Sequence, residues 1–297
     1  MRSKLWRIVL AIFVLVLTIS VFVYYFVTNS SIRQQLSNTS LFTIVLLLVL
    51  YMCTIGALML ITAATLRLCG IKITLRENML LNAYTTVINF FGPLQSGPAF
   101  RAVYLKKTHK LSLKKYATAT LVYYFFFALI SGAFLMSGVL KWWLVPIVLV
   151  IGLTLYLIRK SSVVTSRFSG IDFNNWYFLA AATLLQLSLV ATIYFVELHT
   201  LSPRVSVSQA IIYTGAADFA LFVSITPGAI GFREAFLVFS RRLHHISSAL
   251  IISANILDRV MYLLLLIFLA LFIVVVHAKR QLSTEESQDE EATAKFQ

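Results

Sequence analysis

Three observations predict an all-α polytopic membrane protein. First, 60% of the 297 residues are apolar and only 12% are charged, whereas soluble domains carry about 25% charged residues. Second, the chain contains several apolar runs that are long enough to cross a bilayer as helices. Third, two further apolar stretches are interrupted near their centres by proline and glycine. We expect about six full transmembrane helices and two re-entrant helical hairpins.

The six predicted spans follow one another from the N-terminus. The first one begins among Arg2, Lys4 and Arg7, as a signal peptide would, but it is too long for a signal peptide and lacks a small-residue cleavage site. We therefore interpret it as a retained helix. The predicted spans are 5–27, 41–66, 116–140, 144–158, 173–196 and 247–276.

The distribution of cations predicts a multi-pass protein of the cell membrane with both termini in the cytoplasm. Sixteen lysines and arginines fall in the loops assigned to the cytoplasm, in agreement with the positive-inside rule. A seven-span arrangement, in which 209–227 crosses the membrane, would move two outer arginines inward. The scattered cations form no basic face of the kind that nucleic acids require. The cations assigned to the outside are Arg33, Lys141, Arg204, Arg241 and Arg242.

The first interrupted segment lies between two basic loops and predicts a hairpin at 77–107. Its entering limb, 77–91, has 15 residues. As a helix it would be about 22 Å long, less than the ~30 Å of the hydrocarbon core. Because cations flank both ends, we expect the chain to turn inside the membrane and return to the same side. The residues that supply this structural break are Gly92, Pro93, Gly97 and Pro98.

The second interrupted segment predicts a hairpin at 208–243. Its structural break contains Pro227, Gly228 and Gly231, and the P-x-x-x-G spacing repeats that of the first break. Each half of the chain then holds two spans, a hairpin and one more span, so the halves have opposite orientations. We expect an inverted repeat of 1–140 and 141–280, followed by a disordered acidic cytoplasmic tail at 281–297. Paired interrupted helices of this kind indicate a transport site.

The returning limbs of the two hairpins carry candidate substrate-binding residues. Ser96 and Thr226 stand at helix starts, whose free N–H groups favour a phosphate. Arg101 and Arg233 lie within the first turns and would add forked donors to the same anion. Asn89, beside the first break, is a further candidate, or forms hydrogen bonds between helices. The alternative is that the breaks are packing kinks and that the arginines extend to lipid headgroups.

Ionisable residues inside apolar segments are candidates for function, because charge is costly in a membrane. Glu234, Asp258 and Arg259 therefore join the candidate substrate-binding residues. The Asp258-Arg259 pair either binds the Arg233-Glu234 turn and stabilises the hairpin, or it gates transport or carries protons. Asp218 either couples transport to protons or forms a hydrogen bond with the break.

Motifs of enzymes, metal sites and cofactor sites are not found in the sequence. H-E-x-x-H, G-x-S-x-G and the P-loop are absent. A membrane glycosyltransferase would need a catalytic carboxylate in an outer loop, and Glu197 stands alone at the end of a span. Cys53 and Cys69 have no metal-site or disulfide spacing. We expect no catalytic activity of its own, no metal and no cofactor.

The two breaks and the motif that begins at Pro227 resemble the lysylphosphatidylglycerol synthase transmembrane region, also called the flippase-like domain family. The resemblance covers about 5–277. It implies a bacterial or archaeal membrane protein, like the membrane part of the multiple peptide resistance factor, which flips aminoacylated phosphatidylglycerol. The soluble aminoacyltransferase domain is not found in this sequence, so we expect no synthesis of lysyl lipid. The positions that match the family are Gly97, Arg101, Gly231, Arg233, Glu234 and Arg259, whereas Pro98 and Tyr123-Tyr124 depart from it.

These features favour transport of an anionic phospholipid or a lipid-linked polyprenyl-phosphate conjugate between leaflets. An alternative is a non-catalytic lipid-binding subunit that supports a separate glycosyl- or aminoacyl-transferase. A third is a lipid-modifying enzyme with an unrecognised site. The expected partners are the bilayer, the anionic lipid and, in the second case, the transferase; a homo-oligomer is compatible with each.

Overall fold

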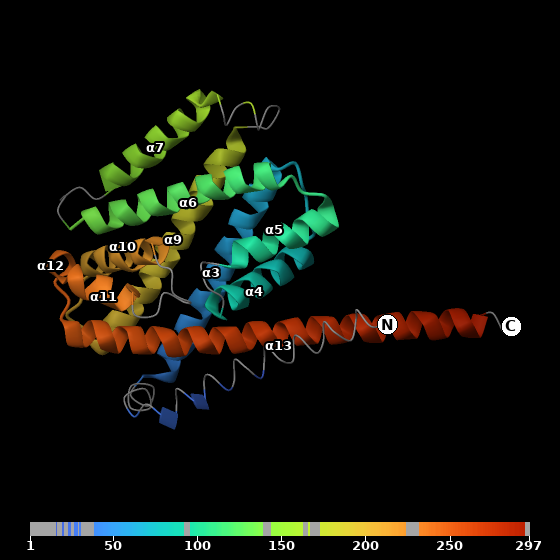
Figure 1. Ribbon diagram of the computed structural model, residues 1–297. Helices are drawn as coiled ribbons and strands as arrows, with labels where there is room; N and C mark the ends of the chain where they lie inside the picture. The colour runs from blue at the N-terminus through green and yellow to red at the C-terminus, as the bar shows by residue number, and fades with distance from the viewer. Residues whose placement is uncertain are drawn as a thin grey trace.

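Figure 1 shows a computed structural model of the chain, which describes residues 39–91, 96–138, 144–162, 173–223 and 232–294 and a few isolated positions elsewhere. The regular structure in these ranges is helical and contains no strand, which confirms the all-α class. The helices are α3 (Leu41–Leu68), α4 (Leu75–Phe91), α5 (Ser96–His109), α6 (Leu113–Met136), α7 (Leu144–Lys160), α9 (Asn174–Leu201), α10 (Val207–Val223), α11 (Phe232–Phe239), α12 (Arg241–His244) and α13 (Ser248–Ala294).

Four of these helices are long and apolar enough to cross a membrane: α3, α6, α9 and α13 from Ser248 to Val276. They correspond to four of the predicted spans. The predicted span 144–158 coincides with α7, which has 17 residues and is shorter than those four. The predicted span 5–27 lies almost wholly outside the described residues. The total of six full spans therefore stays a prediction.

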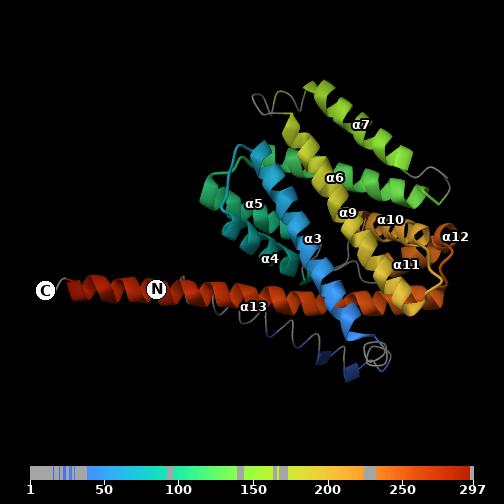
Figure 2. The ribbon, with the colours of Figure 1, turned by 180° about the vertical axis from the view of Figure 1, so that it is seen from behind.

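Helices α3 and α9 pack against each other and run antiparallel through the centre of the bundle (Figure 2). Near one end, the Arg67 guanidinium lies over the ring of Phe178, 5.4 Å from its centroid. Near the other end, the Tyr51 hydroxyl is 3.3 Å from Glu197 Oε1. The remaining helices pack around this pair, so side chains from several elements meet beside it.

Helices α4 and α5 form a helical hairpin. At its open end, Glu77 Oε1 accepts a hydrogen bond from the Tyr104 hydroxyl at 3.0 Å and pairs with His109 Nε2 at 2.7 Å. At its closed end, Asn89 Oδ1 accepts the Gly97 N–H at 2.7 Å. A Cβ at Gly97 would lie 2.8 Å from the carbonyl oxygen of Thr85, so only glycine allows the limbs to come this close.

Helices α10, α11 and α12 form a second hairpin. At its open end, the Gln209 side chain of α10 donates a hydrogen bond to the His244 carbonyl of α12 at 3.2 Å. The two hairpins open at opposite ends of α6. This helix starts directly after α5, and at its other end Gly138 lies beside Ile212 and Leu243 of the second hairpin. With 24 residues, α6 separates the two openings by about 36 Å.

The hairpins and the long helices of the two halves are interlocked. Helix α6 of the first half packs along α10 of the second, and α13 of the second half packs on α4 of the first. Helices α6 and α10 approach closely at Gly215, where a Cβ would lie 2.2 Å from the backbone nitrogen of Leu135. At the other crossing, the rings of Phe90 and Tyr262 lie 5.6 Å apart.

Helix α13 extends beyond the predicted span 247–276 and continues as one helix of 47 residues through Ala294 (Figure 1). The disorder expected for 281–297 stays a prediction. The continuation contains glutamate, glutamine, leucine and alanine, which favour helices, and neither glycine nor proline. Once the transmembrane part of α13 has formed, each added residue extends an existing helix and needs no new nucleus.

Candidate functional site

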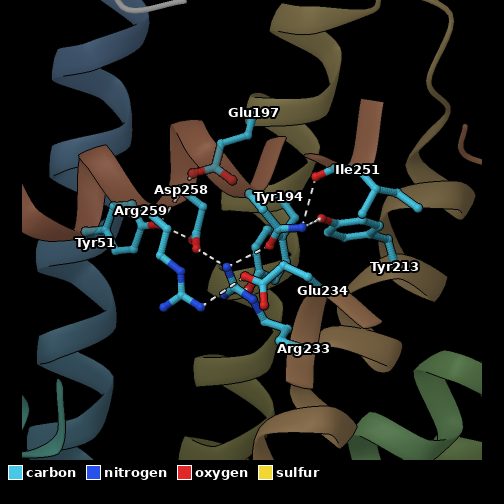
Figure 3. Close-up of polar contacts among 10 residues, drawn as sticks. Tyr51, Tyr194, Glu197, Tyr213, Arg233, Glu234, Ile251, Asp258 and Arg259 are labelled. Atoms are coloured by element: carbon cyan, nitrogen blue, oxygen red, sulfur yellow. Dashed lines mark hydrogen bonds and ion pairs between the residues drawn. The ribbon is translucent and has the colours of Figure 1, made fainter. Parts of the chain in front are cut away.

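The first turn of α11 directs the Arg233 side chain into the bundle (Figure 3). One terminal nitrogen donates a hydrogen bond to the Tyr194 hydroxyl at 3.0 Å. The other donates to Asn255 Oδ1 at 2.8 Å and to Asp258 Oδ2 at 2.5 Å. Arg233 is only 5% exposed and Asp258 only 6%. Helices α9, α11 and α13 are thus joined by a buried, charge-assisted network.

The second oxygen of Asp258 connects this network to α3. Asp258 Oδ1 accepts a hydrogen bond from the Tyr51 hydroxyl at 2.6 Å. The same hydroxyl is 3.3 Å from Glu197 Oε1, so two carboxylates approach one phenol. Glu197 is fully buried at 0% exposure, and its Oε2 has no hydrogen-bond partner. We call Tyr51, Tyr194, Glu197, Arg233 and Asp258 the inner cluster.

A second ion pair lies next to the inner cluster and is more open. Arg259 donates to Glu234 Oε1 at 3.1 Å, with side chains 16% and 30% exposed. The pairing of Asp258-Arg259 with Arg233-Glu234 that the sequence suggested is therefore present. It consists of one buried and one partly exposed bridge between α11 and α13.

Arg101 occupies a different environment on α5. Its terminal nitrogen donates to Asn82 Oδ1 at 3.1 Å, and this amide oxygen is also within 3.0 Å of the Thr62 hydroxyl. The Arg101 Nε is buried and has no hydrogen-bond partner. None of the ion pairs among the described residues includes Arg101. It is thus a cation held by neutral groups, in contrast to Arg233 and Arg259.

Some predicted residues take part in closing the first hairpin. Asn89 accepts the Gly97 N–H, and the Ser96 hydroxyl donates to the Ile88 carbonyl at 3.2 Å. Because these groups are engaged within the hairpin, they hold α4 and α5 together in this conformation. Pro98 lies in the first turn of α5, where its missing N–H breaks no helical hydrogen bond. A role of Asn89 and Ser96 in substrate binding stays a prediction.

Asp218 of α10 is buried at 2% exposure, and its Oδ2 has no hydrogen-bond partner. It takes part in neither of the two ion pairs of α11 and α13. The rest of the predicted set lies outside the described residues: Thr226, Gly92, Pro93, Pro227, Gly228 and Gly231.

Sequence reasoning missed the tyrosines of the inner cluster and misplaced its second carboxylate. We expected the fifth span to end before Glu197, whereas α9 continues to Leu201 and buries Glu197. Tyr51 and Tyr194 lie within apolar runs, where a tyrosine usually fills space. The available signal was the period of α9: Tyr194 and Glu197 are three residues apart and share one helix face.

No group of three or more histidine, cysteine, aspartate or glutamate side chains suited to a metal ion occurs in the described part of the chain.

Comparisons with known proteins place this architecture in a family. The searches of curated proteins and of solved structures returned no match. The family described as the lysylphosphatidylglycerol synthase TM region matches residues 5–270. This match spans nearly the whole chain and agrees with the four apolar helices of spanning length. The chain is therefore a membrane protein that belongs to the lysylphosphatidylglycerol synthase transmembrane-region family.

Proposed function

We propose that this protein moves an anionic phospholipid, or a lipid-linked phosphate, between the two leaflets of the cell membrane. The protein would act as a transporter without chemistry of its own. The headgroup would enter the bundle beside one hairpin and leave beside the other. Arg101 is the observation that carries this proposal, and the arrangement of the hairpins supports it.

Arg101 supports anion binding because its charge is not neutralised. Arg101 is partly buried. A guanidinium without a carboxylate is costly in a membrane, and such residues mark substrate pathways. The Asn82 amide occupies one terminal nitrogen at 3.1 Å, and the buried Nε remains without a partner. A phosphate could form a forked ion pair with a guanidinium in this state. Arg233 and Arg259 already hold carboxylates, so they are less suited to be the first receptor.

The length of the hairpin limbs supports a position inside the membrane. The entering limbs α4 and α10 each have 17 residues, and the returning limbs α5 and α11 have 14 and 8. As helices these limbs are about 26, 26, 21 and 12 Å long, all shorter than the ~30 Å of a hydrocarbon core. Two hairpins that open at opposite ends of α6 would therefore turn within the bilayer, one from each side.

The packing also supports an inverted repeat. Exchanging α3, α4, α5 and α6 for α9, α10, α11 and α13 reproduces the pattern of helix contacts, including the crossed pairs α6 with α10 and α13 with α4. The last helices of the two hairpins, α5 and α12, also end alike. Each is followed by a residue in the left-handed conformation, Lys110 with φ of 53° and His245 with φ of 56°. Transporters with such repeats bind substrate between the halves.

A leaflet-exchange assay tests the role of Arg101. The full chain would be reconstituted into vesicles that contain a fluorescent phosphatidylglycerol, and a membrane-impermeant quencher would report the outer-leaflet fraction over time. Arg101→Ala removes a charge-assisted hydrogen bond to the headgroup worth about 1.5–3 kcal/mol. Its exchange rate should therefore be roughly ten- to hundredfold lower than that of the unmodified protein. Arg101→Lys should retain part of the rate, because it keeps the charge and loses the fork.

Arg76→Ala is the matched control, since Arg76 is an exposed cation on the same hairpin. Its rate should equal that of the unmodified protein. Equal rates for Arg101→Ala and Arg76→Ala would refute the binding role of Arg101. Absence of exchange for every anionic lipid tested, with lipid binding retained, would favour the subunit of a separate transferase instead.

Cysteine labelling tests the orientation of the hairpins. Lys107 and Arg242 are exposed near the open ends of the first and second hairpin. In a protein whose Cys53 and Cys69 are replaced, Lys107→Cys should react with an impermeant maleimide only from the cytoplasmic side. Arg242→Cys should react only from the outer side. Labelling of both from one side would contradict the opposed hairpins and the lipid path between them.

A further inference from the structure

The inner cluster contains one more carboxylate than it can neutralise. Its charged members are Arg233, Asp258 and Glu197. The adjacent Arg259 and Glu234 neutralise each other. The guanidinium of Arg233 donates to Asp258, Asn255 and Tyr194 and makes no hydrogen bond to Glu197. With both carboxylates ionised, the cluster would carry one uncompensated negative charge.

The hydrogen bonds show which carboxylate is left without support. Asp258 accepts from Arg233 at 2.5 Å and from Tyr51 at 2.6 Å, so both of its oxygens are satisfied. Glu197 has only the longer approach of 3.3 Å to the Tyr51 hydroxyl, and its Oε2 has no partner. An ionised carboxylate that is fully buried with a free oxygen loses several kcal/mol of solvation, which a bound proton avoids.

A proton on Glu197 also satisfies the geometry. The Tyr51 hydroxyl has a single hydrogen, which the shorter distance assigns to Asp258. The Tyr51 oxygen can then accept a hydrogen bond from protonated Glu197 Oε1. Glu197 then donates to Tyr51 and Tyr51 donates to Asp258, while Arg233 donates to the other oxygen of Asp258, so that all four side chains are connected (Figure 3).

The remaining groups around the cluster do not replace this proton. Helix α9 contributes the neutral Tyr194, and α10 contributes Tyr213 and the buried carboxyl group of Asp218. Helix α11 contributes Arg233 and Glu234, and α13 contributes Asp258 and Arg259. Arg233 is paired with Asp258, and Arg259 is paired with Glu234. Helix α3 contributes Tyr51. Arg233 is thus the cation that reaches this network, and Asp258 already holds it.

We propose that Glu197 binds and releases a proton in each transport cycle and thereby couples lipid movement to the proton gradient. The step is an acid dissociation: the O–H bond of Glu197 breaks, the proton passes to water, and the carboxylate remains. When an anionic headgroup or a movement of α11 draws Arg233 away from Asp258, the chain of hydrogen bonds transmits the change to Glu197. This inference rests on the proposed lipid transport.

Reconstituted vesicles with an imposed pH difference test the coupling. If one proton moves with each lipid, the ratio of labelled phosphatidylglycerol between the leaflets should change about tenfold per pH unit. Glu197→Gln, which imitates the protonated side chain, should still exchange lipid but show a ratio that does not respond to pH. Tyr51→Phe should weaken the response. Asp218→Asn tests the other buried carboxyl group. A pH response that is lost in Asp218→Asn and kept in Glu197→Gln would overturn the assignment of the proton to Glu197.

Infrared spectroscopy of the purified full chain tests the proton itself and is independent of transport. The difference spectrum between the unmodified protein and Glu197→Gln should contain the carbonyl band of a protonated carboxyl group. Its absence would overturn the proposal, as would an unchanged pH response of Glu197→Gln or accumulation that follows a sodium gradient instead. If the unmodified protein exchanges no lipid under any gradient, the proposed function fails, while the infrared band still decides whether Glu197 carries the proton.

Discussion

The ion pair of Arg233 and Asp258 gives a quantitative prediction about the stability of the bundle. The two side chains are 6% and 9% exposed and their charged atoms are 2.5 Å apart. Removing one partner of such a buried pair costs about 3–5 kcal/mol, because the other charge is left uncompensated. Arg233→Met also strips a donor from Tyr194 and from Asn255. It should therefore lie at the upper end of this range.

The two single substitutions are not equivalent, because Glu197 can respond to one of them. In Asp258→Asn the Arg233 charge remains, and Glu197 is the nearest carboxyl group across the Tyr51 hydroxyl that can ionise to balance it. We expect Asp258→Asn to lie at the lower end of the range. We also expect the double substitution to be less destabilising than the sum of the two, with a coupling of up to about 3 kcal/mol.

Reversible unfolding in mixed micelles with increasing dodecyl sulfate measures these free energies. At roughly 2–4 °C per kcal/mol, a loss of 3–5 kcal/mol lowers the melting temperature by about 6–20 °C. The more exposed pair supplies the control, since Arg259→Gln or Glu234→Gln should cost no more than about 1 kcal/mol. Additivity of the Arg233 and Asp258 substitutions within about 0.5 kcal/mol would refute the assignment of a coupled pair.

Three further substitutions test local features of the fold. Gly215→Ala forces its Cβ against the backbone of α6 at 2.2 Å. It should lower the free energy of unfolding, measured by thermal melting, by about 1–3 kcal/mol. Gly132 has open space around it, so Gly132→Ala should not lower this free energy. Asn89→Ala removes the acceptor of the Gly97 N–H and should speed proteolysis at the closed end of the first hairpin; unchanged cleavage would contradict the capping role. Burial lowers the pKa of His244. The protein should therefore lose stability as the pH falls below about 6.5. His244→Gln should remove this pH dependence of the melting temperature.

The pH effect at His244 follows from its hydrogen bonds. Its Nε2 lies 3.0 Å from the Leu237 carbonyl and its Nδ1 accepts the Ile246 N–H at 3.2 Å. Both contacts are satisfied by the neutral ring with hydrogen on Nε2, and a proton on Nδ1 would face the Ile246 hydrogen. Because the folded protein prefers the neutral form, the unfolded chain binds more protons below its own pKa. Stability therefore decreases as the pH falls through this range.

Those parts of the fold that depend on local pattern could be predicted from the sequence. Apolar length alone predicted four of the long helices, because this signal acts within one segment. Helices α4 with α5 and α10 with α11 do pack as pairs, whereas their re-entrant position in the membrane stays a prediction. The pairing of α11 with α13 was one of two alternatives that the sequence offered, since Arg233-Glu234 and Asp258-Arg259 both lie in apolar surroundings, where charge is costly. Helix ends were less accessible, as the extension of α13 to Ala294 shows.

The contacts of Tyr51 and Glu197 with Asp258 could not be predicted, because the inner cluster is built from four helices. Tyr51 and Asp258 are separated by 207 residues and Tyr51 and Glu197 by 146. No local pattern indicates that these side chains meet. Their contact depends on α3 and α9 packing antiparallel with α13 beside them. The same limit applied to Arg101, whose lack of a carboxylate partner becomes visible only when the neighbours of α5 are known.

The two hairpins therefore differ in what they offer to a substrate, although their helices pack alike. The first hairpin holds Arg101 with the neutral Asn82 amide, so its charge remains free to attract an anion. The second hairpin holds Arg233 with a carboxylate, so its charge is engaged and becomes free only when that bridge opens. In the proposed transport, a headgroup that passes from the first hairpin to the second would compete with Asp258 for Arg233. Such competition would link arrival of the lipid to the charge of the inner cluster, as coupled transport requires.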